Sequence, residues 1–309
     1  MDFTIHQLQV LRKVSQAGSI TRAAEALNLT QPAVSIQLRN LQRQFSEPLI
    51  EVIHKRVYLT DAGREVLAVS EDIIGAMESL KQRILSRRGE ISGRLRLSVV
   101  STGKYVMPYF ISSFIRRHPA VELSLEVTNK QQVVKSLEDN AVDFSLVSML
   151  PTNLSLNRLK LMPNYLVLVA ARNYPVGGRL DRKSLGGHPM ILREQGSATR
   201  QMMEDFLKRN ALSAIRRLEL SSNEAVKQAV LSGLGISVMP IIGLRNELHL
   251  KQIRILPFRG LPMKSDWNLV WLAGKALNPA STALIEHIRK ESNSIIGQHF
   301  DWVERYVGR

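Results

Sequence analysis

The sequence predicts three parts in chain order: an all-α winged helix-turn-helix, one long linker helix, and an α/β domain of two lobes. Residues 20–41 have the pattern of two short helices joined by a tight turn, residues 61–88 that of one amphipathic helix, and after Gly93 strands alternate with helices. We therefore place the parts at 1–60, 61–88 and 89–309. With 309 residues, of which 44% are hydrophobic, the chain can bury sizeable cores.

The helix pair is predicted from its turn. The first helix carries the small residues Ala23 and Ala24, which allow a second helix to approach closely. Asn28 follows where the chain must reverse, and asparagine tolerates a left-handed backbone. Thr30 is a good N-cap for the second helix, and Pro32 lies in its first turn, where a missing N–H costs nothing. An opening helix over residues 4–16 turns three apolar side chains toward the pair: Leu8, Leu11 and Val14.

The second helix of the pair is expected to read DNA. Val34, Leu38 and Leu41 recur at the spacing of one buried face, and the opposite face is polar and basic. Such a helix in a helix-turn-helix suits the major groove. The residues expected to face DNA are Thr30, Gln31, Pro32, Ser35, Ile36, Gln37, Arg39 and Arg43.

Residues 48–60 predict a short β-hairpin, or wing, because apolar residues flank the polar tip His54, Lys55 and Arg56. The tip is either a solvated turn or a contact to phosphates or the minor groove. Beside a DNA-reading helix the second interpretation is favoured.

The helix at 61–88 is too long for a small winged domain, and its apolar residues follow a near-heptad seam. Those residues are Val66, Ile73, Met77, Leu80 and Ile84, with Ser70 as a weak point. The stripe predicts pairing with a second copy of the chain, and packing onto its own chain is the alternative. Residues 87–93 break the pattern and predict a hinge.

The α/β part shows two sets of elements. Strands are expected at 95–100, 121–128, 143–148, 165–171, 190–194, 235–240 and 268–274, and helices at 106–117, 131–139, 198–209, 223–231 and 279–292. The alternation predicts mostly parallel sheets. The first lobe is expected at about 93–162 and 267–296, and the second at about 163–266.

A ligand cleft is expected where strands end beside helix N-termini. Hydroxyl groups gather in five such loops, together with Lys104 and Arg200, and this combination suits a carboxylate or phosphate. Each hydroxyl alone is more simply a helix cap, but five converging loops favour a ligand. The candidate residues are Ser101, Thr102, Lys104, Thr128, Ser148, Ser197, Thr199, Arg200 and Asn223.

The net charge of +15 does not single out the DNA-reading end. Residues 1–88 hold 12 basic and 9 acidic residues, and residues 89–309 hold 30 and 18. Solubility explains most of this charge; attraction to DNA and a basic cleft for an anion are the sharper alternatives. Zero cysteines exclude disulfides and cysteine-based zinc sites. No signal peptide or transmembrane segment is found, so we expect a cytoplasmic protein without a membrane partner.

The sequence matches known catalytic motifs only incompletely. The segment 98–105 lacks the first glycine of a phosphate loop, and Val238 replaces the third glycine of a dinucleotide fingerprint. No nucleophile elbow is found, and the seven histidines have no metal-ligand spacing. We therefore expect no cofactor, no metal and no enzyme, although Ser101 and Lys104 leave a weak nucleophile pair. The rivals are a solute-binding or transport protein and an enzyme that uses the cleft.

These segments together resemble the LysR-type transcriptional regulators over nearly the whole chain. The matching segments are AGSITRAAEALNLTQPAVSIQLRNL, PLIE followed by KRVYLTDAGREVL, SGRLRLSVV, GSATR and SSNEAVKQAVLSGLGISVMP. The resemblance implies a periplasmic-binding-protein-like effector domain. It also implies a homodimer or homotetramer that binds a dyad-symmetric site on double-stranded DNA and activates or represses promoters when a small-molecule effector binds, with RNA polymerase as a further candidate partner. Within the family, TQPAVSIQLRNL, VSTGKY and SATR look most like regulators of Calvin-cycle (RuBisCO) operons, which are similar to sensors of phosphorylated sugars and related anionic metabolites.

Two departures from the family pattern matter. The usual Gly-x-x-Leu-Phe-x-Arg after the DNA-reading helix is replaced by SEPLIEV at 46–52, so Lys55 or Arg56 must supply the charge of the wing. Many members have arginine where this chain has Ile36, and an apolar residue there favours a thymine methyl group over guanine or phosphate.

Overall fold

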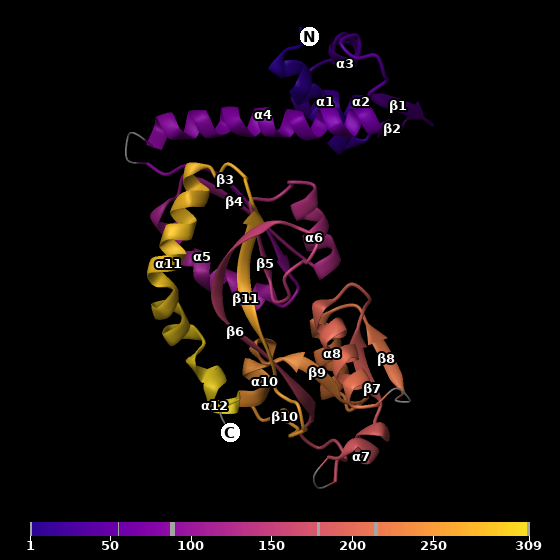
Figure 1. The fold of residues 1–309 in the computed structure, drawn as a ribbon, viewed down its shortest axis with the longest axis vertical. Helices are drawn as coiled ribbons and strands as arrows, with labels where there is room; N and C mark the ends of the chain where they lie inside the picture. Colours follow the sequence, from indigo (N-terminus) through magenta and orange to yellow (C-terminus); the bar gives the residue numbers. More distant parts are fainter. Residues whose placement is uncertain (1, 55, 87–89, 178–179, 213–215, 308–309) are drawn as a thin grey trace. The chain divides into compact units, whose positions relative to one another are not determined.

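The computed structural model describes residues 2–54, 56–86, 90–177, 180–212 and 216–307. The chain divides into two compact units, Met1–Gly89 and Glu90–Arg309, and each is described by itself. Figure 1 shows the helical first unit and the α/β second unit. The expected fold class is confirmed: a helical helix-turn-helix unit followed by a two-lobed α/β unit.

The first unit consists of α1 (Ile5–Ala17), α2 (Ile20–Leu27), α3 (Gln31–Gln42), β1 (Ile50–Ile53), β2 (Arg56–Leu59) and α4 (Asp61–Ser86). Its core joins α1 to α3, and the predicted burial of Leu8, Leu11 and Val14 is confirmed. Val34, Leu38 and Leu41 form the buried face of α3, also as predicted.

The turn between α2 and α3 has the backbone that its residues predict. Asn28 adopts a left-handed conformation (φ 54°, ψ 41°), and its N–H bonds to the carbonyls of Ala24 and Glu25, which ends α2. Ala23 and Ala24 are buried, so α3 can lie close. The Thr30 hydroxyl accepts a hydrogen bond from the Ala33 N–H at 3.3 Å and caps α3.

The wing is a two-stranded antiparallel hairpin whose last pair is Ile53 with Arg56. It is fixed to the helices by the buried Val57, whose N–H donates to the Gly18 carbonyl at 3.0 Å. Its base touches the first turn of α4 so closely that a Cβ on Gly63 would lie 1.9 Å from the Leu49 carbonyl oxygen. Glycine at this position is therefore what lets α4 start directly under the hairpin.

The apolar residues of α4 fall into two groups. One group packs onto the same chain, and the other is left exposed for pairing with a second copy, so each predicted alternative describes part of the helix. Ile74 is only 2% exposed and joins the core of its own unit, with Val66 and Ile73 packed beside it. Val69, Met77 and Leu80 remain 58%, 44% and 53% exposed. One face of α4 thus packs on its own chain, while another apolar face stays uncovered within the unit. The side chain of Ile84 and residues 87–89 of the predicted hinge lie outside the described part of the chain.

The second unit begins with β3 (Gly93–Val100), η1 (Gly103–Tyr105), α5 (Met107–Arg117), β4 (Val121–Thr128), α6 (Lys130–Glu138), β5 (Phe144–Val147) and β6 (Leu156–Ala171). It continues with α7 (Arg182–Gly186), β7 (Met190–Arg193), α8 (Ala198–Arg209), β8 (Arg217–Leu220), α9 (Asn223–Leu231), β9 (Ser237–Pro240), η2 (Ile241–Gly243), α10 (Arg245–His249) and β10 (Ile253–Ile255). It closes with β11 (Met263–Leu272), α11 (Pro279–His299), η3 (Asp301–Val303) and α12 (Glu304–Val307).

The expectation of mostly parallel sheets is wrong for the strands that join the lobes. β3 is parallel to β4 and β5, and β7 is parallel to β8, but β6 is antiparallel to β9, β10 and β11. β6 carries the chain from the first lobe to the second, and β11 carries it back, so the two must run in opposite directions. In the described part, the sheet order is β10-β6-β11-β5-β3-β4, with β9 also paired to β6.

Several elements are longer than predicted, among them β11, which starts at Met263 rather than 268. β6 starts at Leu156 rather than 165, because residues 156–160 already pair with β11. α11 runs to His299 rather than 292, and the chain that follows buries Phe300 and Trp302. Figure 1 shows α5 and α11 on one side of the first-lobe sheet and α6 on the other. This layering leaves the carboxyl ends of β3 and β7 directed toward the junction of the lobes.

Candidate ligand cleft and nucleic-acid interface

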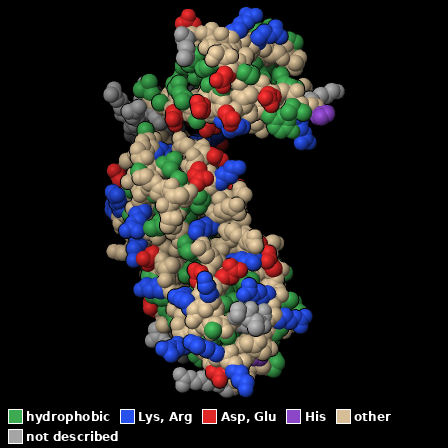
Figure 2. All heavy atoms as spheres, turned by 45° about the vertical axis from the view of Figure 1, so that its right-hand side comes forward, with side chains coloured by type: hydrophobic (Ala, Val, Ile, Leu, Met, Phe, Trp, Pro, Cys, Tyr) green, Lys and Arg blue, Asp and Glu red, His purple; other side chains and the backbone are tan. Residues whose placement is uncertain are grey.

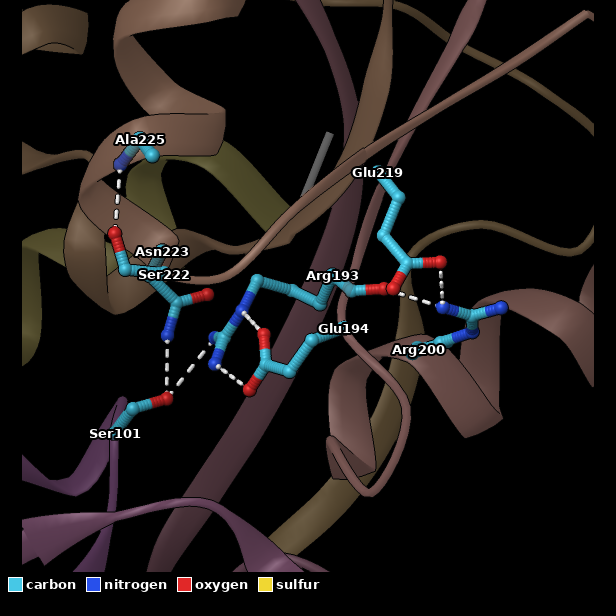
Figure 3. Close-up of polar contacts among 8 residues, drawn as sticks. All are labelled: Ser101, Arg193, Glu194, Arg200, Glu219, Ser222, Asn223 and Ala225. Atoms are coloured by element: carbon cyan, nitrogen blue, oxygen red, sulfur yellow. Dashed lines mark hydrogen bonds and ion pairs between the residues drawn. The ribbon is translucent and has the colours of Figure 1, made fainter.

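Three chain segments meet where the two lobes join. Ser101 follows β3 in the first lobe, while Arg193 ends β7 and Asn223 starts α9 in the second. Arg193 Nη1 donates to Ser101 Oγ at 3.0 Å, and Asn223 Nδ2 donates to the same oxygen at 2.9 Å (Figure 3). Because Ser101 accepts both bonds, its own O–H is left to donate elsewhere. One hydroxyl of the first lobe is thus held by two side chains of the second.

Arg193 is a buried cation at this junction, with only 3% of its surface exposed. Its guanidinium makes two 2.7 Å bonds to the carboxylate of the neighbouring Glu194 (Figure 3). A buried charge without a partner would be strongly unfavourable, and the bidentate carboxylate removes most of that cost. The sequence did not predict Arg193 as a cleft residue. It could have been found from its position, because it is an arginine at the end of a strand whose other residues are all buried.

Arg200, which the sequence predicted as a contact to the ligand, is hydrogen-bonded to groups other than Ser101 and Asn223. Its guanidinium donates to Glu219 at 2.5 Å, to Glu204 at 2.9 Å and to the Arg193 carbonyl at 3.0 Å. The hydrogen bond to Glu219 raises the pKa of Arg200 further above its ordinary value. In this conformation Arg200 therefore supports the backbone of Arg193, and Arg193 is the arginine that reaches Ser101.

Five of the predicted cleft residues are more than nine-tenths buried: Thr102, Ser148, Ser197, Thr199 and Asn223. Thr102 precedes η1 and Ser197 precedes α8, and neither side chain caps the helix that follows it. Ser222, in contrast, is an ordinary cap, because its hydroxyl accepts from the Ala225 N–H at 3.0 Å (Figure 3). The alternative that each hydroxyl is a helix cap therefore does not describe Thr102 or Ser197.

Thr128 and Lys104 lie nearer the surface. Thr128 ends β4 and is partly buried, and Lys104 is exposed with its ammonium 5.1 Å from the Tyr105 ring centroid. The Ser101 hydroxyl accepts its hydrogen bonds from Arg193 and Asn223 rather than from Lys104. A serine–lysine nucleophile pair gains no support from this arrangement.

The rim of the cleft is bridged as well. The Gln131 N–H in α6 donates to the Gly196 carbonyl at 3.3 Å, and Lys130 Nζ donates to Gln201 Oε1 at 3.1 Å. Gly196 has φ 82°, and a Cβ there would lie 2.9 Å from Gln131 Oε1. The first lobe therefore contacts the β7–α8 loop both inside the cleft and at its edge.

A second cation near the junction is neutralised. Lys227 Nζ lies 2.8 Å from Glu247 and 3.0 Å from Glu224. Burial lowers the pKa of Lys227, but its hydrogen bonds to Glu247 and Glu224 outweigh this and raise it. Burial also raises the pKa of the nearby Tyr105, whose ring would lie 2.9 Å from a Cβ on Gly243. Lys227 is thus paired by two carboxylates, and the Tyr105 ring of η1 packs against Gly243 of η2.

Two negative findings concern the described residues alone. None of them form a group of three or more His, Asp or Glu that could hold a metal ion. Among the same residues, no helix combines the length and apolar character needed to cross a membrane.

The predicted DNA-facing side of α3 is open within its unit. Thr30, Gln31, Pro32, Arg39 and Arg43 are exposed or half-buried, and Ser35 and Gln37 accompany them on the outer surface. Ile36 is 51% exposed, so its side chain is available on the outer face of α3. Gln31 Nε2 donates to Ser35 Oγ at 3.1 Å, so these two polar side chains are held together on the outer face.

At the wing, His54 and Arg56 are exposed at the tip, and His54 adopts a left-handed backbone with φ 49°. Lys55 lies outside the described residues. Figure 2 shows both basic and acidic side chains on the face of the first unit that it draws. The basic residues of this unit are spread over α1, α2, α3, the wing and α4, so charge alone does not mark one end of it.

Comparison with known proteins matches both units. Residues 5–64 match the family described as bacterial regulatory helix-turn-helix protein, lysR family, and residues 88–293 match the LysR substrate binding domain. The transcriptional activator CmpR of Synechocystis is 35% identical over 287 residues, covering 92% of this chain and 94% of CmpR. A RuBisCO operon transcriptional regulator of Allochromatium vinosum is 37% identical over 294 residues, covering 94% of this chain and 97% of that protein.

Among solved structures, the regulatory domain of Synechocystis CcmR in complex with 2-PG is 35% identical, with a TM-score of 0.62. It covers 65% of this chain and 98% of its own. The expected likeness to regulators of RuBisCO operons is thus confirmed by the relatives. The chain belongs to the LysR family of bacterial transcriptional regulators, with an N-terminal DNA-binding unit and a C-terminal substrate-binding domain.

Proposed function

We propose that the cleft between the lobes binds a small anionic metabolite and that this binding controls the activity of the regulator on DNA. The observation that carries the proposal is the buried Arg193, whose guanidinium joins Ser101 of the first lobe to the second lobe. An anion placed between these residues meets the Arg193 guanidinium, whose charge Glu194 already pairs, together with the Ser101 O–H and the Asn223 amide. Charge-assisted hydrogen bonds of this kind are among the stronger ones in proteins.

The loops around Arg193 support the same ligand class. The uncapped hydroxyls of Thr102 and Ser197 lie at the starts of η1 and α8, where backbone N–H groups favour negative charge. Ser148, Thr128 and Thr199 complete the hydroxyl set, and exposed Lys104 adds long-range attraction. The related CcmR regulatory domain was solved with 2-PG, an anionic metabolite, so 2-PG is a suitable first probe.

For the DNA side, we infer that α3 enters the major groove and that the wing contacts the backbone. Gln31, Ser35 and Ile36 face the bases, and Arg39, Arg43 and Arg56 contact phosphates. The uncovered apolar face of α4 pairs with a second copy, so that two α3 helices meet successive grooves about 34 Å apart on a dyad-symmetric site. Each of the three parts then has one role: DNA reading for residues 1–60, dimerisation for 61–88 and sensing for 89–309. The cleft acts as a sensor rather than a catalyst, and the protein works in the cytoplasm.

The test is calorimetric titration of the full chain with 2-PG. Arg193→Gln keeps an amide donor near Ser101 but removes the charge, and we expect at least tenfold weaker binding, since hydrogen bonds to charged groups contribute about 1.5–3 kcal/mol. Arg158→Gln is the matched control, because Arg158 is exposed on β6 and lies outside the cleft set. Equal loss in both variants, or no loss in Arg193→Gln, would show that the anion binds elsewhere.

A further inference from the structure

A cavity lies in the α/β unit, and none of the candidate cleft residues line it. It is bounded by β6, by the edge strand β10 and the chain that follows it, by α10, and by the C-terminal α12. Its volume is about 800 Å³, within the range of small-molecule sites. Ser101, Arg193 and Asn223 are not among its lining residues.

The charged side chains that are described in the lining of this cavity are all basic. Arg172, Lys251, Arg254 and Arg305 all contribute to the wall, and the described residues that line it include no acidic side chain. Arg172 and Lys251 are exposed, and Arg305 forms an ion pair at 3.8 Å with the exposed Asp301, which does not line the cavity. Four cations around a concave, partly apolar surface focus a positive potential into it, which attracts an anion.

Arg254 is the most constrained of the four. Its Nη2 donates to the Tyr174 carbonyl at 2.7 Å, which fixes the side chain across the end of β6. Its Nε is buried and has no hydrogen-bond partner. A ligand in the cavity can therefore contact the partly exposed end of the Arg254 side chain and not its buried Nε.

The rest of the lining is apolar. Leu248 and Leu256 are buried beneath it, and Tyr306 and Val307 of α12 form a partly exposed wall. A free inorganic anion would leave this surface in water, and a purely apolar molecule would bring no negative charge to the four cations. A ligand that satisfies both parts has an anionic head and an apolar body.

We propose that this cavity binds a small amphipathic organic anion, of the type of a medium-chain fatty acid, at a site separate from the interlobe cleft. The head lies among Arg172, Lys251, Arg254 and Arg305, and the apolar body lies against Leu256 and Tyr306. Because α12 forms one wall, the bound ligand also holds the C-terminal segment against the second lobe. The proposal does not depend on the identity of the ligand in the cleft.

The experiment is calorimetric titration of the full chain with decanoate, and with decanol and inorganic phosphate as partial mimics. We expect saturable binding of one decanoate per chain and at least tenfold weaker binding of either mimic. Arg254→Met and Arg172→Met are each expected to weaken decanoate binding at least tenfold. Arg158→Gln, on the exposed surface of β6, is expected to bind as the parent protein does.

Cross-titration separates the two sites. Arg254→Met is expected to bind 2-PG as the parent protein does, which also shows that it is folded, and Arg193→Gln is expected to bind decanoate normally. If Arg254→Met does not fold, Arg172→Met carries the test. The proposal is overturned if decanoate fails to saturate, if decanol binds equally well, or if Arg193→Gln loses decanoate. It is also overturned if a glutamate-rich peptide displaces decanoate at a lower concentration, because the surface would then dock acidic chain segments.

Discussion

At the scale of single residues, Gly63 holds the wing against α4 because it has no side chain. The carbonyl of Leu49 occupies the space that a Cβ would need, and the Gly63 N–H donates to Thr60 Oγ at 3.0 Å. Gly75 lies on the same helix, and a Cβ added there would have nothing within 4 Å. The two glycines therefore differ in the space around them: backbone atoms lie against Gly63, and nothing lies within 4 Å of a Cβ on Gly75.

We predict that Gly63→Ala lowers the free energy of unfolding of the first unit by about 1–3 kcal/mol through overpacking. Gly75→Ala should instead raise it by about 0.4–1 kcal/mol, because alanine favours the helix. All three tryptophans lie in the second unit, at Trp267, Trp271 and Trp302. In a urea titration, circular dichroism reports the unfolding of both units, whereas tryptophan fluorescence reports the second unit alone. A change seen by circular dichroism and not by fluorescence therefore belongs to the first unit. Effects of the same sign in both variants would contradict the packing described for Gly63.

Ile36 shows how one residue can change the chemistry of a DNA-reading helix. Its neighbours on the outer face of α3 are polar or charged, and its own side chain is half exposed. In water this exposure has no benefit, whereas a thymine methyl group would bury part of it at about 0.8 kcal/mol per methyl-sized group. The sequence departure therefore predicts a more apolar base contact than an arginine would make.

At the scale of elements, α3 and the wing form the predicted DNA surface. Arg39 and Arg56 lie on these two elements and are not among the described ion pairs. We predict that Arg39→Ala and Arg56→Ala each weaken binding to specific and nonspecific DNA alike, and reduce the slope of log affinity against log salt by about 1. Gel-shift titration at several salt concentrations measures both quantities.

The control for this pair is Arg12→Gln. Arg12 lies on α1 and faces Glu78 of α4 at 4.0 Å rather than the outer face of α3. It should therefore leave the salt slope as in the parent protein. A slope that falls equally in Arg12→Gln would mean that the charge of the whole unit, rather than α3 and the wing, governs binding.

The α5–α11 contact predicts a dependence of stability on pH. His287 is buried between the helices, with Nε2 2.9 Å from Ser113 Oγ and Nδ1 3.4 Å from Arg117. Burial, together with the charge of Arg117, lowers the pKa of His287 below 6.5; Glu291 opposes this and His118 adds to it. The folded state thus disfavours the protonated ring.

Because the unfolded chain then binds the proton more readily, the free energy of unfolding should fall as pH drops below about 6.5 toward the folded pKa, and this contribution is fully present above 6.5. His287→Gln keeps a polar group near Ser113 but cannot titrate, so the decrease over this range should become smaller. Urea unfolding at a series of pH values measures it. An unchanged decrease in His287→Gln would assign the effect to other groups.

At the scale of the whole molecule, sensing and DNA reading are carried by separate units. Thr102 and Thr199 belong to opposite lobes and are both buried at the cleft. We predict that Thr102→Ala combined with Thr199→Ala abolishes the effect of 2-PG on DNA binding while leaving the affinity for DNA unchanged, because both residues belong to the second unit and α3 belongs to the first. Gel-shift titration with and without 2-PG tests this. Simultaneous loss of both properties would indicate misfolding rather than a lost ligand contact.

Local patterns explain how much of the fold could be anticipated. β4, α8 and α9 have the predicted ends, because strand alternation and residues such as Pro119 and Ser222 act within a few positions of the element they limit. The turn at Asn28 is set in the same local way. The extension of β6 to Leu156 could not be anticipated, because it depends on pairing with β11 more than a hundred residues later.

The sequence by itself determined the helix-turn-helix, the wing, the long α4 and the family, since each depends on residue types at short spacings. Tertiary structure decided the direction of the strands that join the lobes, the division of α4 into covered and uncovered faces, and the arginine that enters the cleft. Arg193 and Ser101 are 92 positions apart, and Arg200 was the more evident candidate in a glycine- and serine-rich loop. Only the fold shows that the Arg200 guanidinium is hydrogen-bonded to Glu219 and Glu204. Contacts between distant segments produce no repeating pattern in the sequence from which they could be predicted.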